Sequence, residues 1–470
     1  MTGPAPAART AVARLERARR LSTAVGRIYL QLKATQLVAG GWARLADGWP
    51  RAVPGPPRRF AEQRRGAWRR FHRDSAETLY DTAIEMQGLV LKGCQYLGAR
   101  ADLVPDAWTR VLARLQDRVP PREPWVVRRV IEDELGRPLE RLFRSFAPRP
   151  VASASLAQVH EAVLHDGRRV AVKVQYPEVA ALVRSDLANL RALLRAIGWL
   201  ERDLDLVPIV DELGRHVPRE LDFLAEARHA ERMAALFAGR DDVSVPAVHR
   251  ALSSRRVLVM DYVDGVRITD AAALEAAGID REAVVATLVE AWCEQVLVHG
   301  FFQADPHPGN LLVGTRGPHR GRLVLLDFGL ARELPPRFRH DLLGFAMALL
   351  RRDPEAIADA LATLGFATRD GGRDALVALA RAALAILREL AEAGSLSPAH
   401  MARVGAELAE TLRRHPLVRV PGHVVLLGRT LGLLSGVART LRTRVDPLRI
   451  VLPYVIGSAP PAPAAPRGRR

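Results

Sequence analysis

Two stretches decide the fold: QADPHPGNLLVG, residues 303–314, and LVLLDFG, residues 323–329. In the first stretch, four residues separate Asp305 from Asn310. A turn and an apolar strand then lead to Asp327, which is followed by Phe328 and Gly329. A lone Asp-Phe-Gly is weak evidence, because this tripeptide also arises where ordinary strands end in turns. The interpretation of the fold therefore depends on the order in which several motifs follow one another along the chain.

Asp, four residues, Asn and then a strand ending in Asp-Phe-Gly is the layout of a kinase catalytic loop with its metal-binding motif. Phosphoryl transfer needs a carboxylate to receive the proton of the attacking hydroxyl, and oxygen ligands to hold Mg²⁺ on the phosphates. We predict Asp305 as the catalytic acid or base, with Asn310 and Asp327 on the metal. His307 lies between two prolines and has no second histidine at ligand spacing, so we expect it to fix the loop.

The strand Val170-Ala171-Val172-Lys173 precedes this region and ends in a lysine. Only three of the 69 Lys and Arg residues are lysines, namely Lys33, Lys92 and Lys173. Arginine cannot replace a compact ammonium in a tight polar site, so a retained lysine is informative. We predict that Lys173 is catalytic and contacts nucleotide phosphate. The alternative is a solubilising lysine at a strand edge.

A helical glutamate should pair with that lysine, and the segment ELDFLAEA, residues 220–227, offers several acids among which helix geometry does not choose. No G-x-G-x-x-G precedes Lys173. A loop of small residues stands there instead, in which Ser155 could donate a hydrogen bond to phosphate, although alanine lacks the backbone freedom of glycine. The predicted nucleotide-binding positions in this loop are Ala152, Ser153, Ala154 and Ser155.

Periodicity predicts an amphipathic helix up to about residue 47, which packs on the protein or lies on a membrane, and a Pro-rich linker near residues 49–60. Short β-branched runs in 151–176 and 244–263 predict one small antiparallel sheet, with helix between them from about 179 to 237. Beyond residue 280 we expect helices, apart from one strand before Gly329. The predicted divisions are 1–74 (helix and linker), 75–149 (helical extension), 150–263 (N-lobe), 264–345 (C-lobe), 346–457 (C-terminal helices) and 458–470 (disordered tail).

Five motifs in this order resemble the UbiB (AarF) family of atypical kinases: SLAQVH in its Ala-rich loop, VAVKVQYP, ELDFLAEA, QADPHPGN and LLDFG. The resemblance covers about residues 85–330. It implies an α+β, two-lobed protein-kinase-like fold in which an N-terminal helical extension folds over the nucleotide cleft, followed by C-terminal helices. It also implies that ATP and Mg²⁺ are bound.

By the same resemblance, Lys92 and Gln95 match the Lys-x-Gly-Gln motif of the extension, while Cys94 replaces its glycine. Arg100 and Asp102 follow. Glu226 is implied as the partner of Lys173, and Glu220 and Asp222 as an acidic motif near Lys92. His229 stands where Asn is usual and Gln303 where His is usual. The implied adenine hinge includes Asp261, Tyr262 and Val263, with Asp261 replacing the commoner Glu.

The formal charge of +17 suits an anionic partner. We expect a lipid or isoprenoid precursor as substrate and no nucleic acid. Arg58, Arg59, Arg64, Arg65, Arg69 and Arg70 are candidates for contact with an anionic membrane; the alternative is an ordinary solvated surface.

Cys94 and Cys293 form no metal or disulfide pattern, and we read no secretion signal or membrane span. The apolar stretches around Val284–Phe302 and Val424–Val437 are interpreted as buried helices.

These features predict an ATP- and Mg²⁺-binding atypical kinase or ATPase that supports isoprenoid quinone or other lipid metabolism. We expect it in the cytoplasm, or peripherally at the inner face of the cell membrane. Two alternatives stay open: a regulatory pseudokinase without productive turnover, and a small-molecule kinase of the aminoglycoside phosphotransferase type. The second does not account for the Lys92 motif or for SLAQVH.

Overall fold

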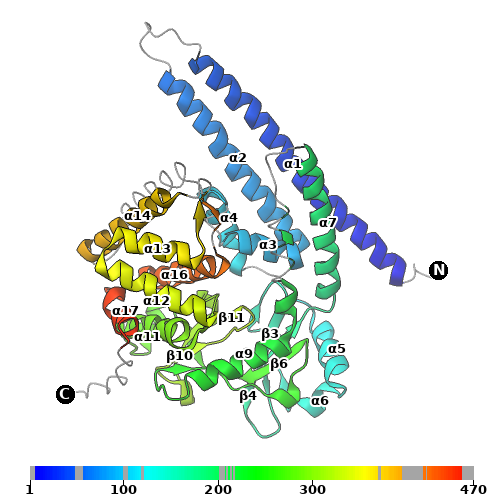
Figure 1. The fold of residues 1–470 in the computed structure, drawn as a ribbon. Coiled ribbons are helices and arrows are strands. Elements are labelled where there is room, and N and C mark those ends of the chain that lie inside the picture. Colours follow the sequence, from blue (N-terminus) through cyan, green and yellow to red (C-terminus); the bar gives the residue numbers. More distant parts are fainter. Residues whose placement is uncertain are drawn as a thin grey trace. The chain divides into compact units, whose positions relative to one another are not determined.

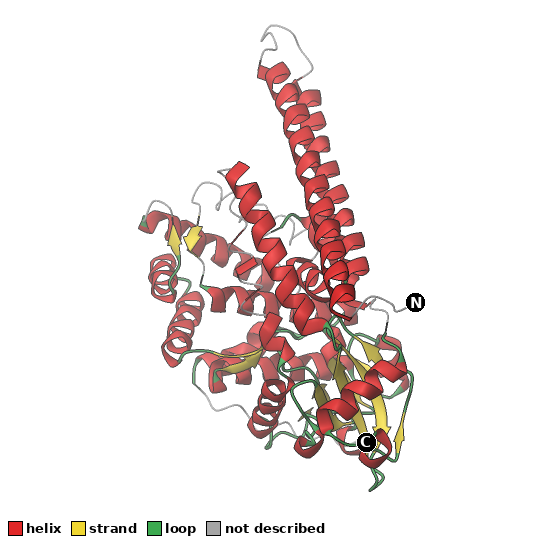
Figure 2. Cartoon of the chain, turned by 90° about the vertical axis from the view of Figure 1, so that its right-hand side faces the viewer, coloured by secondary structure: helices red, strands yellow, loops and turns green. Residues whose placement is uncertain are grey.

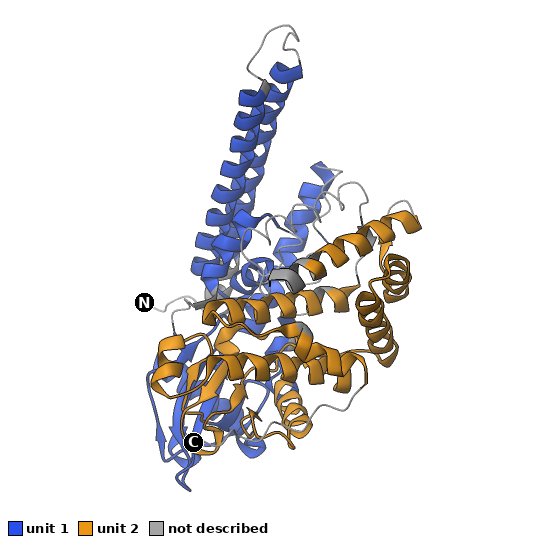
Figure 3. Cartoon of the chain, turned by 90° about the vertical axis from the view of Figure 1, so that its left-hand side faces the viewer, with its two compact units in different colours: residues 1–225, 248–261 blue, residues 226–247, 262–470 orange. Residues whose placement is uncertain are grey.

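A computed structural model describes residues 6–47, 57–98, 104–117, 121–200, 207, 210–211, 214, 217–368, 372–393, 417–419 and 421–457 (Figure 1). The chain divides into two compact units, residues 1–225 with 248–261 and residues 226–247 with 262–470 (Figure 3). Both units combine helices with sheets, which is the predicted α+β class (Figure 2). The predicted tail, Arg100 and Asp102 lie outside the described residues.

The helices of the first unit are α1 (Pro6–Asp47), α2 (Pro57–Met86), α3 (Gly88–Gly98), α4 (Asp106–Leu112), α5 (Pro124–Leu135), α6 (Leu139–Leu142) and α7 (Val179–Leu200), with the 3-10 turns η1 (Ala113–Asp117), η2 (Val217–Leu221) and η3 (Arg250–Leu252). Helix α2 includes the end of the predicted linker and continues without interruption past residues 74 and 75. The predicted domain boundaries remain predictions.

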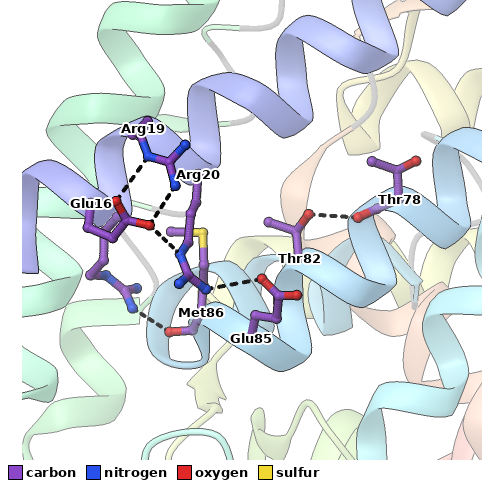
Figure 4. Close-up of polar contacts among 8 residues, drawn as sticks. Glu16, Arg19, Arg20, Thr78, Thr82, Glu85 and Met86 are labelled. Carbon is purple, nitrogen blue, oxygen red and sulfur yellow. Dashed lines mark hydrogen bonds and ion pairs between the residues drawn. The ribbon is translucent and has the colours of Figure 1, made fainter.

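Helices α1 and α2 lie side by side and antiparallel (Figures 1 and 2). Leu21, Ala24 and Ala39 are the buried side of α1. Figure 4 shows Arg20 donating both to Glu16 of its own helix, at 2.9 Å, and to Glu85 of α2, at 3.2 Å. One face of the N-terminal helix therefore packs on the protein, while Leu30, Leu37 and Leu45 on α1 are exposed.

The predicted antiparallel sheet is present in the first unit. It contains β1 (Ser145–Phe146), β2 (Ala152–Ser153), β3 (Ala157–Val163), β4 (Arg169–Gln175) and β6 (Val257–Asp261), in the order β1-β3-β4-β6 with β2 also on β3. Alternate residues of β4 face the core, where Val170 and Val172 meet Val127 and Ile131 of α5. Gly167 takes the left-handed conformation, φ 89°, that the tight turn before β4 requires.

The described helices of the second unit are α9 (Phe223–Leu236), which begins in the first unit, α10 (Ala271–Ala276), α11 (Arg281–Cys293), the π-helix η4 (Glu294–His299), the 3-10 turns η5 (Pro308–Asn310) and η6 (Gly317–His319), α12 (Pro336–Arg351), α13 (Pro354–Leu364), α14 (Arg373–Ala393), α16 (Gly422–Leu441) and α17 (Pro447–Val455). The stretch Val284–Phe302, predicted as a buried helix, is helical only as far as His299 of η4, and Phe301 and Phe302 belong to a strand. Its side in the core includes Val284, Val285, Leu288, Ala291 and Trp292, whereas Val298 is exposed.

The second unit has more strands than the single one predicted beyond residue 280. One sheet has the order β5 (Val243–Ser244), β10 (Leu323–Leu325), β9 (Leu311–Gly314) and β7 (Gly265–Arg267); β8 (Phe301–Gln303) pairs with β11 (Ala331–Glu333), and β12 (Ala367–Thr368) with β13 (Leu417–Arg419). Each of these strands has two to four residues, too few for a period of two to stand out in the sequence.

Helix α16 is, among the helices in the described ranges, the one long and apolar enough to cross a membrane by length and composition. Core helices of soluble proteins pass the same test. Thr430, Leu434, Val437 and Leu441 form its buried side, whereas Leu431 is exposed. The stretch predicted as a buried helix, Val424–Val437, is thus buried on one side only.

Candidate active site

The loop after β8 carries Asp305 and is fixed by its own residues. The ring nitrogen Nδ1 of His307 accepts a hydrogen bond from the Gly309 N–H at 3.1 Å, and the His307 carbonyl accepts one from the Asn310 N–H at 2.8 Å. These two bonds form the one-turn η5, which includes Asn310. His307 therefore has the loop-fixing role expected for it.

A hairpin brings Asn310 and Asp327 to the same end of two paired strands. Strand β9 begins directly after Asn310, and its Leu311 pairs with Leu325 of β10. The Leu326 N–H donates to the Asn310 carbonyl at 3.1 Å, which closes the pairing one residue before Asp327. Asn310 also reaches back, because its Nδ2 donates to the Asp305 carbonyl at 3.2 Å. The second unit thus assembles Asp305, Asn310 and Asp327 in one place.

Gln303, where the resembled family has His, links this loop to the Asp-Phe-Gly segment. Its Nε2 donates to the Asp327 carbonyl, and its own carbonyl accepts from Trp292 Nε1 at 3.2 Å. Gln295 Oε1 accepts from the Gln303 N–H at 2.9 Å. Gln303 is fully buried, so its direct effect is on the position of the Asp327 backbone.

Arg429 of α16 is a site residue that the sequence did not reveal. Its Nη2 lies 2.9 Å from Asp305 Oδ1, and the side chains are 10% and 21% exposed. The available signal was one arginine within the apolar run VVLLGRTLGLL, residues 424–434. In the sequence, that arginine is no more than an interruption of a hydrophobic stretch.

Helix α9 carries Glu226 and His229 in the second unit. Glu226 is buried in the first turn. His229 Nδ1 lies 3.1 Å from the Phe328 carbonyl, and burial lowers the pKa of its imidazole, so the ring is neutral and Nδ1–H is the donor. His229 thereby connects α9 to the Asp-Phe-Gly segment. Lys173 belongs to the first unit and Glu226 to the second, so their pairing remains a prediction.

Lys173 lies in the middle of the first unit's sheet, opposite Val159 on β3 and Leu258 on β6. Its ammonium nitrogen is 5.1 Å from the centroid of the Phe223 ring, close enough for a cation–π contact. A central strand position with a partly buried side chain does not match the alternative of a solubilising lysine at a sheet edge.

The Ala-rich loop is the tight turn between β2 and β3. The Ala154 N–H donates to the Ala157 carbonyl at 2.8 Å, and Tyr176 secures the turn through Ser153 Oγ at 2.9 Å and the Ala154 carbonyl at 3.1 Å. Ala152 and Ala154 are exposed, whereas Ser155 is buried. Exposed small residues would allow close approach of a ligand to the backbone. Phosphate binding by this loop remains a prediction.

Gln158 and His160, two of the three polar residues of SLAQVH, are fully buried and bonded inside the first unit. Gln158 Nε2 lies 2.8 Å from His160 Nε2, and His160 Nδ1 lies 2.8 Å from the Ala147 carbonyl. Burial lowers the pKa of His160, so the neutral ring accepts at Nε2 and donates from Nδ1. Gln158 Oε1 accepts from the Arg122 N–H at 2.6 Å. These side chains hold the scaffold together.

The predicted hinge begins at the last residue of β6. Asp261 Oδ1 lies 2.7 Å from His249 Nε2 within the first unit, so this carboxylate is already engaged by the protein. Tyr262 and Val263 follow in the second unit. Adenine binding by backbone groups of this segment remains a prediction.

The extension helix α3 is fastened by the residues of its motif. Lys92 Nζ lies 2.6 Å from Glu220 Oε2, and Gln95 Nε2 donates to the Leu115 carbonyl at 3.0 Å. Asp222 Oδ1 accepts from the N–H groups of Leu224 and Ala225, which caps the start of α9. The acidic segment therefore holds α3 through Glu220 and begins α9 through Asp222.

Cys94, which replaces the family's glycine, lies inside helical α3 and has no left-handed backbone conformation. Its side chain packs among Leu89, Leu91 and Leu112. Burial raises the pKa of the thiol to about 12, so it is protonated at neutral pH. Cys94 is a small packed side chain here, and the helix accommodates it without a glycine-only conformation.

The comparisons agree with this arrangement. A family model described as the ABC1 atypical kinase-like domain matches residues 114–361. AarF domain-containing protein kinase 1 of Gallus gallus is 34% identical over 384 residues, covering 80% of this chain and 72% of the relative. The protein of the same name from Mus musculus is 39% identical over 298 residues, covering 63% of this chain and 57% of the relative.

A solved structure, the complex of Rv3197 with erythromycin from Mycobacterium tuberculosis, has a TM-score of 0.58 and 23% sequence identity. The match covers 83% of this chain and 97% of that one, and it supports the fold alone. The family match, the relatives and the Asp305–Asn310–Asp327 arrangement lead to one assignment: the chain belongs to the UbiB (AarF) family of ABC1 atypical kinase-like proteins and has a protein-kinase-like fold.

Proposed function

We propose that the protein binds ATP with Mg²⁺ and transfers or hydrolyses the γ-phosphoryl group in support of isoprenoid quinone or other lipid metabolism. The main support for this proposal is that Asn310 is hydrogen-bonded both to the Asp305 loop and to the strand that leads into the Asp-Phe-Gly segment. A carboxylate that is one-fifth exposed lies beside two further oxygen-bearing side chains on a rigid hairpin. This is what phosphoryl transfer needs from a protein, since positioning and charge stabilisation supply most of the rate.

The residues present fit a magnesium ion. Asn310 uses its NH₂ group for the Asp305 carbonyl, which leaves its side-chain oxygen for a cation. Asp327 Oδ1 accepts a hydrogen bond from the Gly329 N–H at 3.0 Å, which orients this carboxylate, and carboxylate oxygens are ligands that Mg²⁺ prefers. When bound, Mg²⁺ neutralises charge that develops on the phosphates. Asp305 would accept the proton of the attacking hydroxyl or water, while Asn310 and Asp327 would hold the metal.

Further residues are proposed to bind the nucleotide. Lys173 would contact phosphate and pair with Glu226. The exposed Ala152 and Ala154 would let the nucleotide approach the backbone of the Ala-rich turn. Asp261, Tyr262 and Val263 would receive adenine through their backbone groups.

The proposed substrate class follows from the helical extension that contains α3. Lys92–Glu220 and the Gln95 bond hold α3 in place. In the resembled family such an extension blocks the cleft that binds peptides in ordinary kinases. ATP turnover coupled to a lipid or isoprenoid precursor therefore fits better than protein phosphorylation. The Lys92, Gln95, Glu220 and Asp222 cluster would regulate access.

A peripheral contact with an anionic membrane is part of the proposal. The six candidate arginines from Arg58 to Arg70 are exposed on α2, and Leu30, Leu37 and Leu45 are exposed on α1. Each arginine near an anionic surface contributes about 1 kcal/mol. Exposed apolar side chains that reached the interface would add burial there. The contact would appear as binding to anionic liposomes that weakens as salt is raised.

The test is steady-state ATP hydrolysis with Mg²⁺, with and without anionic liposomes carrying a quinone-precursor mimic. Asp305→Asn should lower turnover by about 10²–10⁴-fold, because the proton acceptor is removed. Asp241→Asn is the matched control, since that carboxylate is almost fully exposed. Turnover that rises with liposomes and disappears in Asp305→Asn supports the proposal. Nucleotide binding without Asp305-dependent turnover would favour the regulatory pseudokinase.

A further inference from the structure

Arg429 meets the candidate proton acceptor from a helix outside the kinase-like motifs. Its guanidinium is nine-tenths buried, and Nη2 lies 2.9 Å from Asp305 Oδ1. The Nε atom of Arg429 is also buried and has no hydrogen-bond partner among the described residues. Among the contacts of the described residues, this ion pair is the one that reaches the Asp305 carboxylate.

Stability alone does not explain an arginine at this place. Desolvating a guanidinium is costly, and an apolar side chain often stabilises such a position as well as an ion pair does. Here the cost is not fully compensated, since one buried N–H donor is left without a partner. The rest of this stretch of α16 is almost entirely apolar. Burial of Arg429 costs free energy, and its guanidinium contacts Asp305. The position of this arginine therefore indicates a role at Asp305.

The position of Arg429 is fixed by its neighbours on α16. Thr430 is buried, and its hydroxyl donates to the Leu426 carbonyl at 2.9 Å and lies 3.4 Å from the Ala304 carbonyl. Leu426 and Leu427 pack against a buried cluster that includes Phe302 and Ala304, the residues on either side of Gln303. On α16, the residues that flank Arg429 are thus themselves packed or hydrogen-bonded. Arg429 is presented to Asp305 on a rigid element.

We propose that Arg429 is a positioning residue for the reaction. It holds Oδ1 of Asp305 so that Oδ2 points to the nucleophile and receives its proton as the γ-phosphoryl group leaves ATP. This inference rests on the proposed function, because it takes Asp305 as the proton acceptor. An aspartate has two soft side-chain torsions, so without this contact its carboxylate would sample unproductive orientations. A misplacement of about 1 Å at a reacting group can cost about 100-fold in rate.

The experiment compares Arg429→Ala, Arg429→Met and Arg429→Lys with wild type in the MgATP hydrolysis assay. Arg439→Ala is the matched control, because Arg439 is exposed on the same helix. We expect kcat to fall about 10- to 100-fold in the Ala and Met variants while KM for ATP stays unchanged, since the nucleotide contacts are intact. Lysine should restore part of kcat, and added guanidinium chloride at non-denaturing concentration should partly restore Arg429→Ala.

Thermal unfolding of each variant checks that the fold is retained, and the Met variant keeps most of the side-chain volume if Ala does not fold. Wild-type or higher kcat in folded Arg429→Met overturns the inference and identifies the contact as dispensable or as a brake. An equal loss in Lys, Met and Ala without guanidinium rescue also overturns it, since this is a purely structural effect. Absence of turnover in wild type is a different result, which refutes the proposed function and the inference with it.

Discussion

The catalytic loop, residues 303–310, and the segment SLAQVH, residues 155–160, use their polar side chains in opposite ways. Gln158 and His160 are fully buried and bond to each other, to the Ala147 carbonyl and to the Arg122 N–H. Asp305 is one-fifth exposed, and one of its oxygens pairs with Arg429. The hydrogen bonds of Gln158 and His160 are made inside the scaffold. The Asp305 carboxylate is oriented through Oδ1, and its Oδ2 is available for a reaction.

The difference teaches how to separate two kinds of motif that look equally strong in a sequence. A buried polar group whose hydrogen-bond partners all lie within its own unit stabilises the fold, because the loss of any of these hydrogen bonds would cost free energy of folding. A group that is oriented by the protein but not saturated by it is available to a substrate or metal. Asp305 and Asn310 belong to the second kind, and Gln158 and His160 to the first.

Of the three substitutions that test this comparison, Asp327→Asn should have the largest effect, because it removes the proposed metal-binding carboxylate. Turnover should fall by about 100-fold or more, because a charged oxygen ligand of the metal is replaced by a neutral amide. The fold should be retained, since the amide oxygen can still accept from the Gly329 N–H. The measurement is ATP hydrolysis across a Mg²⁺ titration, with thermal unfolding in parallel. Full turnover at ordinary Mg²⁺ would place Asp327 with the scaffold residues.

His160→Phe should have a smaller effect, on stability alone. Phenylalanine keeps a ring next to Phe146, but it leaves the Ala147 carbonyl and one of the two N–H donors of Gln158 Nε2 without their His160 partner; the other donor keeps its bond to the Arg122 carbonyl at 3.3 Å. We expect a loss of about 2–4 kcal/mol in the free energy of unfolding, measured by denaturant titration. His165→Phe is the control, because that histidine is exposed in the turn before β4. Loss of turnover per folded molecule, with stability unchanged, would contradict the scaffold role.

The smallest effect concerns Cys94, which lies in the Lys92–Gln95 motif but is buried like a scaffold residue. Burial raises the pKa of the Cys94 and Cys293 thiols to about 12. A raised pKa keeps both thiols protonated from about pH 7 to about pH 9, and alkylation requires the thiolate. Alkylating reagents should therefore label neither cysteine in the folded protein in this range, and both in denaturant. Fast labelling of Cys94 alone in wild type, and its absence in Cys94→Ser, would show that α3 opens.

Much of the candidate site could be predicted because its pieces are local. The spacing of Asp305, Asn310 and Asp327 reflects one loop and one hairpin, and the scarcity of lysine in the chain singles out Lys173. The small antiparallel sheet also followed from its β-branched runs. Strands β7, β8, β9 and β11 were missed. Whether a segment of three or four residues forms a strand depends on the strand with which it pairs, and that pairing is not visible in the local sequence.

The sequence by itself determined the order of the chemical groups, the class of fold and the family, since these are written in short-range patterns of residue type and spacing. Only the tertiary structure showed that Arg429 meets Asp305, and that Gln158 and His160 satisfy each other inside the sheet. The physical reason is the same in each case. The role of a side chain depends on its hydrogen-bond partners. Arg429 reaches Asp305 from helix α16, whose packing no local sequence pattern specifies.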